Sequence, residues 1–117
     1  MSNGRSVIVL EDEVISAMGL QSQLRRAGFE TVYLATSFDA AMEIYRRHHP
    51  AIAIVDINLQ NHRSGLDFIR EAESLERVII LSGYDKRFYD EELRGLDYAT
   101  FLEKPAHFSA IIRAISE

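Results

Sequence analysis

The chain has 117 residues, a length that fits one domain, and with 47% hydrophobic residues it can bury a real core. Its formal net charge of -5 argues against binding to nucleic acid, because phosphate contacts need clustered lysine and arginine. The absence of cysteine excludes disulfides, thiol catalysis and cysteine-ligated zinc. No apolar run approaches the roughly 20 residues of a membrane span, and none makes a signal peptide, so we expect a cytoplasmic protein.

Five apolar runs predict buried strands. Most of them lack the alternation of apolar and polar residues that is typical of a strand with one solvent-exposed face. Runs of this kind are typical of parallel sheets that helices cover on both faces. In chain order the runs are Val7–Leu10, Thr31–Ala35, Ala51–Val55, Val78–Leu81 and Ala99–Leu102.

Two helices are predicted in the first half of the chain. Apolar residues recur at helical spacing over 14–27, and Gly28 is a plausible C-terminal stop. Ser37 is placed to cap a second helix, which His49-Pro50 then ends.

Three more helices follow, and they complete a β-α unit that is repeated five times. We expect a third helix around 66–72, a fourth near Lys86 to Leu93 with a weak and acidic pattern, and a fifth from Phe108 to the chain end. The alternation predicts a (βα)5 flavodoxin-like α/β fold, a doubly wound parallel sheet of five strands in the order 2-1-3-4-5. Residues 1–117 would form one domain.

Acidic residues stand at the ends of the first and third predicted strands. Glu11 and Asp12 follow the first strand, and Asp56 ends the third. In a flavodoxin-like strand order, these two ends flank the crevice in which sites form. Three carboxylates there repel one another unless a cation neutralises them, and oxygen ligands without cysteine favour Mg²⁺.

Two further strand ends carry compatible groups. Ser82 offers a hydroxyl after the fourth strand, and Lys104 offers a compact positive charge after the fifth. Carboxylates with Mg²⁺, a hydroxyl and a lysine form a constellation for phosphoryl transfer. In it, a carboxylate is the nucleophile and becomes an aspartyl phosphate.

These motifs, in this order and each at a strand end, resemble the receiver domain of two-component response regulators. The resemblance covers essentially the whole chain and rests on Glu11-Asp12, Asp56, Ser82-Gly83 and Lys104-Pro105. It implies that Asp56 is the phosphoacceptor. It also implies that Mg²⁺ is held by Glu11, Asp12, Asp56 and the backbone carbonyl of Asn58.

The same resemblance implies how the switch would work. Lys104 would pair with the phosphoryl group, Ser82 would swing to bond it, and Phe101 would rotate inward after phosphorylation. The Lys104–Pro105 peptide bond is expected to be cis.

The resemblance also implies partners. A sensor histidine kinase or a histidine phosphotransfer protein would donate the phosphoryl group to Asp56. A downstream effector would read the face made by the fourth helix, fifth strand and fifth helix, with no direct contact to nucleic acid or membrane. Dimerisation through this face stays open.

Three positions depart from the family pattern. Gln60 stands where the family usually has proline, in a loop that is one residue longer. Gly95 comes early before the fifth strand, so the fourth helix is expected to be short or shifted. Tyr84 is bulky enough to screen a phosphate from water, and with Asn58 it is expected to tune the phosphate lifetime.

Two alternatives remain. One is a pseudo-receiver, an interaction module with the fold but without phosphorylation. The other is a small phosphatase that uses Asp56 on an outside substrate, although haloacid-dehalogenase-type phosphatases favour a second aspartate where this chain has Asn58. Otherwise we expect no enzyme, since a receiver catalyses only its own phosphorylation and dephosphorylation. His48-His49 is interpreted as a solvated helix end, because adjacent residues point to different helix faces.

Overall fold

Five parallel strands form one sheet in the order β2-β1-β3-β4-β5 in the computed structural model, which describes residues 4–58 and 62–116. The strands are β1 (Val7–Leu10), β2 (Val32–Ala35), β3 (Ile52–Ile57), β4 (Arg77–Ser82) and β5 (Thr100–Glu103). The helices are α1 (Val14–Arg26), α2 (Phe38–His48), α3 (His62–Glu71), α4 (Phe108–Ser116) and the short 3₁₀ helix η1 (Lys86–Tyr89). The predicted doubly wound sheet and its strand order are confirmed.

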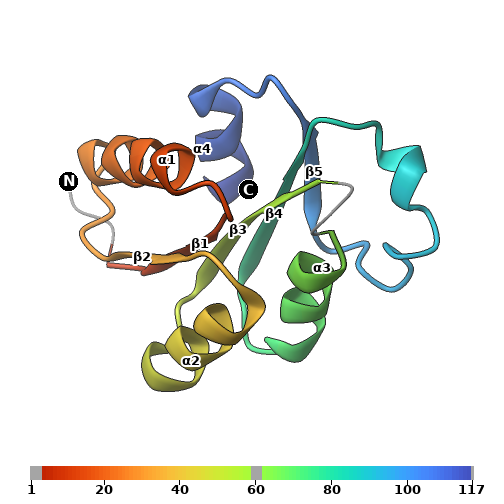
Figure 1. Ribbon diagram of the computed structural model, residues 1–117. Coiled ribbons are helices and arrows are strands. Elements are labelled where there is room, and N and C mark those ends of the chain that lie inside the picture. Colours follow the sequence, from red (N-terminus) through yellow and green to blue (C-terminus); the bar gives the residue numbers. More distant parts are fainter. Residues whose placement is uncertain (1–3, 59–61, 117) are drawn as a thin grey trace.

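Helices cover both faces of the sheet: α1 and α4 pack on one face, and α2 and α3 on the other (Figure 1). Alternate residues of β1 therefore enter different cores, since Ile8 packs with the α2–α3 side whereas Val7 and Val9 pack with the α1–α4 side. This double burial explains the unbroken apolar runs of the sequence. None of the described helices is long and apolar enough to cross a membrane.

The predicted helix ends of the first half are confirmed. Ser37 caps α2, with its hydroxyl accepting the N–H of Ala40 at 3.1 Å. The helix ends before Pro50 with His49 in the left-handed region, at φ 46°. Gly28, just beyond α1, has φ 106°, which glycine adopts without steric cost.

The expected fourth helix does not extend over 86–93, whereas the expectation that it is short agrees with the structure. The chain forms only the four residues of η1 there, and turns follow up to Ala99. Arg70 of α3 donates to the backbone carbonyls of Glu92 and Arg94, which are thus satisfied by a side chain rather than by helical N–H groups. The stretch from Lys86 to Ala99 is called the η1 segment below. The face expected to contact an effector is therefore made by the η1 segment, β5 and α4.

β3 extends two residues further than predicted. Asp56 and Ile57 pair with Leu81 and Ser82 of β4, so the ladder continues past Val55. Asp56 consequently lies within the strand rather than at the start of a loop. This places its carboxylate on a part of the sheet that is paired with β4.

Candidate functional site

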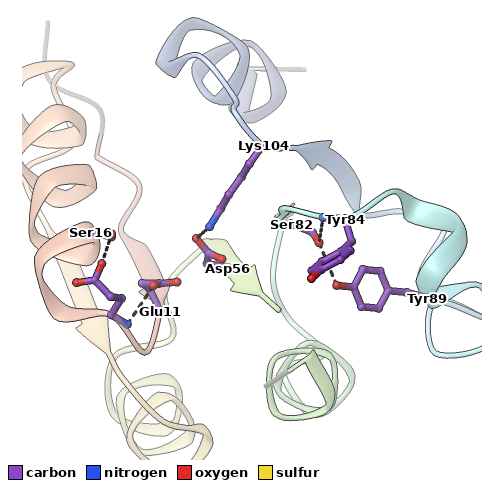
Figure 2. A network of polar contacts seen from close by, with 8 residues as sticks. Glu11, Ser16, Asp56, Ser82, Tyr84, Tyr89 and Lys104 are labelled. Carbon is purple, nitrogen blue, oxygen red and sulfur yellow. Dashed lines mark hydrogen bonds and ion pairs between the residues drawn. The ribbon is translucent and has the colours of Figure 1, made fainter. Parts of the chain in front are cut away.

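Asp56 and Lys104 form an ion pair at the carboxyl end of the sheet. The Nζ atom of Lys104, directly after β5, lies 2.5 Å from Oδ2 of Asp56 (Figure 2). The Asp56 side chain is only 12% exposed, so it needs a charged partner at the rim of the core. Lys104 is that partner, and its ammonium lies where it can also contact an anionic group attached to Asp56.

Glu11 lies on the other side of Asp56, at the end of β1. It is buried, with 7% exposure, and its Oε1 accepts the backbone N–H of Glu13 at 3.0 Å. Burial first, and then the negative charge and a hydrogen bond of Asp56, raise the pKa of Glu11 to about 7. Two carboxyl groups are thus held close together, with the ammonium of Lys104 beside them.

A pocket of about 250 Å³ opens beside these carboxylates. Its lining comes from the ends of β1 and β3 and from the starts of α2 and α3: Leu10, Glu11, Asp12, Thr36, Ser37, Phe38, Asp56, Ser64 and Gly65. The structure therefore brings the three predicted acidic residues to one pocket, with Asp12 exposed to solvent.

The donor set of this pocket fits a hydrated Mg²⁺ rather than a closed metal cage. Across residues 4–58 and 62–116, no three acidic or histidine side chains converge as a ready-made metal cluster. Mg²⁺ keeps several water molecules and uses one or two carboxylates, so an open, acidic pocket suits it. Asn58, whose carbonyl was predicted to contribute, directly follows β3, whereas Gln60 lies outside the described residues.

The hydroxyl of Ser82 is bonded to neighbouring residues in this structure, and its expected turn toward a phosphoryl group stays a prediction. Its side chain is fully buried, its hydroxyl lies 3.1 Å from the hydroxyl of Tyr89, and it accepts the N–H of Tyr84 at 3.0 Å (Figure 2). Phe101 is partly buried, with its ring 6.1 Å from that of Tyr89.

Sequence reasoning missed Tyr89. A tyrosine among apolar residues signals that its hydroxyl needs a partner when buried, but the partner could not be named from the sequence.

The structure also places three other features named from the sequence. The Lys104–Pro105 bond is cis, as expected. Tyr84 is 41% exposed, and its ring meets the edge of Phe88 at 5.2 Å. The two histidines pack against aromatic rings, His48 stacking on Tyr33 and His49 lying beside Tyr45, as suits a helix end.

Comparison with known proteins identifies the family. Residues 7–116 match the family described as the response regulator receiver domain. The chain belongs to the response-regulator receiver family. As a member of this family, the chain has a role in two-component signalling. In such systems, receiver domains generally interact with histidine kinases and effectors.

Two bacterial regulatory proteins are similar to the chain in sequence. It is 31% identical over 113 residues to the transcriptional regulatory protein PdtaR of Mycobacterium tuberculosis, covering 95% of this chain and 55% of that protein. The chain thus spans about half the length of PdtaR. It is 25% identical to the chemotaxis protein CheY of Thermotoga maritima, with 97% of each chain covered.

Solved structures share the receiver fold. CheY4 of Vibrio cholerae superposes with a TM-score of 0.81 at 15% identity, covering 97% of this chain and 98% of that one. A response regulator of Burkholderia pseudomallei superposes with a TM-score of 0.80 at 26% identity, covering 94% and 65%. The latter structure holds a phosphorylated aspartic acid, a calcium ion and citrate.

Proposed function

We propose that this receiver domain is a switch controlled by phosphorylation of Asp56. The observation that carries the proposal is the placement of the Asp56 carboxylate, between the ammonium of Lys104 and an acidic pocket. The phosphorylated aspartate and calcium ion in the Burkholderia pseudomallei relative support the same chemistry here. A sensor histidine kinase or a histidine phosphotransfer protein is the proposed donor.

The transfer exchanges one bond for another. A carboxylate oxygen of Asp56 attacks the phosphorus of a phosphohistidine, the new O–P bond forms, and the P–N bond breaks with its electron pair going to the histidine nitrogen. Lys104 stays beside Asp56 and offsets negative charge on the phosphoryl oxygens as they approach. Attack by water on the phosphorus later releases inorganic phosphate and resets the switch. The domain thus acts only on its own aspartate.

The acidic pocket would hold Mg²⁺ through Glu11, Asp12, Asp56 and the backbone carbonyl of Asn58. The ion supplies positive charge that neutralises the carboxylates and the phosphoryl oxygens. Burial and the neighbouring charge of Asp56 raise the pKa of Glu11, and a bound cation would offset the repulsion between these two carboxylates.

A downstream effector would contact a surface that does not include the residues lining the pocket. Phosphorylation adds charge and strong acceptor oxygens, which bias an element that has two arrangements. The proposed element is Ser82, Phe101 and the η1 segment, and the proposed contact face for an effector, or for a second copy of the domain, is that segment with β5 and α4. The proposed compartment is the cytoplasm.

Intact mass spectrometry after incubation with Mg²⁺ and acetyl phosphate tests the proposal. The expected result is one added phosphoryl group on the wild type and none on Asp56→Asn. Asp67→Asn, which changes an exposed aspartate on α3, is the matched control and should be labelled like the wild type. An unlabelled wild type that also fails to bind beryllium trifluoride with Mg²⁺ would favour the pseudo-receiver instead.

A further inference from the structure

The hydroxyl groups of Ser82 and Tyr89 are bonded to each other inside the protein. They lie 3.1 Å apart, and the two side chains are 0% and 1% exposed. The Ser82 hydroxyl also accepts the backbone N–H of Tyr84 at 3.0 Å, and Figure 2 shows both bonds converging on it. Buried hydroxyls give up such partners at a cost, because water cannot replace them.

The backbone of Ser82 is fixed while its side chain can turn. Ser82 is the last residue of β4, opposite Ile57, and so lies on the strand next to that of Asp56. The N–H of Lys104 donates to the carbonyl of Ser82 at 2.6 Å, which holds the strand end in place. Rotation about the Cα–Cβ bond is therefore the simplest way to redirect the hydroxyl toward Asp56. That rotation takes it away from Tyr89.

Tyr89 connects this hydroxyl to the irregular segment before β5. It ends η1, and Leu93 and Leu96 anchor the following turns in the same core. The ring of Phe101 lies 6.1 Å from that of Tyr89, and Phe101 has no hydroxyl of its own. Tyr89, unlike Phe101, can therefore bond Ser82 through its side chain. A shift of the Tyr89 ring would change the packing of both Phe101 and the η1 segment.

We propose that Tyr89 is a positioning residue of the switch: its hydroxyl holds Ser82 away from Asp56 in the unphosphorylated protein. When Ser82 turns to a phosphoryl group on Asp56, the bond breaks and the segment from Lys86 to Ala99 is released. This inference rests on the proposed function, since it needs a phosphoryl group on Asp56. Loss of the Tyr89 hydroxyl removes a partner of Ser82 in the resting state alone, and so favours the phosphorylated arrangement.

Calorimetric titration with beryllium trifluoride in Mg²⁺, a mimic of the phosphoryl group on aspartate, tests the inference. Tyr89→Phe should bind about 2- to 10-fold more tightly than the wild type, the range expected for one net hydrogen bond. Tyr98→Phe is the matched control, because Tyr98 lies in the same segment but is 60% exposed. In a Ser82→Ala background, Tyr89→Phe should raise the affinity much less than it does in the wild type, whereas an effect independent of Ser82 would persist in full.

Hydrogen exchange of the unmutated protein gives a second measurement that does not depend on the Tyr89→Phe variant. Adding beryllium trifluoride and Mg²⁺ should speed amide exchange over 86–99, and should not do so in Ser82→Ala. Equal affinities of wild type and Tyr89→Phe, or unchanged exchange over 86–99, would overturn this inference alone. A wild type that neither binds beryllium trifluoride nor accepts phosphate would overturn the proposed function together with it.

Discussion

Lys104 is bonded to Ser82 through its backbone, with its N–H 2.6 Å from the Ser82 carbonyl oxygen. The same residue reaches Asp56 with its side chain at 2.5 Å. Lys104, which directly follows β5, therefore contacts the ends of both β3 and β4. The position of the ammonium group beside Asp56 is consequently set by the sheet and not by a mobile loop.

Replacement of Lys104 tests its electrostatic role. Lys104→Ala should slow labelling of Asp56 by acetyl phosphate about 100-fold, the loss typical of removing one preorganised charge or donor from a transfer site. The initial rate of the mass increase measures the effect. Arg113→Ala, at an exposed position on α4, should label at the wild-type rate. Equal rates for Lys104→Ala and the wild type would contradict the role of its charge.

The raised pKa of Glu11 predicts a dependence of stability on pH without divalent cations. The pKa of this carboxyl is about 7 in the folded protein and 4.5 as its ordinary value, so the folded state binds the proton more tightly. The stabilising contribution of Glu11 is fully present below about pH 4.5 and is lost as the pH rises through 7.

Urea unfolding in EDTA measures this dependence between pH 4.5 and pH 8. Glu11→Gln cannot titrate, so the stability of the wild type relative to this variant should fall as the pH rises. Added Mg²⁺ should reduce the fall. A constant difference between the two proteins across this range would show that Glu11 does not titrate as described.

Gly65 of α3 packs closely against β3. A Cβ atom there would lie 2.7 Å from Cγ1 of Val55 and 2.9 Å from Cγ2 of Ile57, both in fully buried side chains. Gly65→Ala should therefore lower the free energy of unfolding by about 1–3 kcal/mol, through overpacking.

Gly19→Ala in α1 is the paired control for Gly65→Ala. Nothing lies within 4 Å of its added Cβ, so this change should raise stability by about 0.5–1 kcal/mol through helix propensity. Chemical denaturation of both variants measures the contrast. Stabilisation by Gly65→Ala as well would mean that the α3–β3 contact is looser than described.

Arg70 holds the irregular segment onto α3. Its guanidinium donates to the carbonyls of Glu92 and Arg94. Arg70→Leu should speed hydrogen exchange of the amides over 86–99 and leave the exchange of the β-strands nearly unchanged, because local opening of this segment does not require global unfolding. Arg46→Leu, a change of an exposed arginine on α2, is the comparison variant. Identical exchange in the two variants would contradict the tether.

The main elements of the fold and the charged centre of the site could be predicted from the sequence because their signals are local. Unbroken apolar runs indicated strands buried on both faces, and Ser37 and Gly28 marked helix ends by backbone chemistry alone. Asp56 and Lys104 could be brought together because parallel strands all present their carboxyl ends at one edge of the sheet.

The sequence by itself determined the alternation of strands and helices and the charged residues at the strand ends, since periodicity and strand direction suffice for both. The tertiary structure alone decided the path from Lys86 to Ala99 and the pairing of Tyr89 with Ser82. In that segment the helical pattern is weak, so a distant arginine and buried anchors such as Leu93 outweigh local propensity. Contacts between residues far apart along an irregular path have no periodic signal in the sequence.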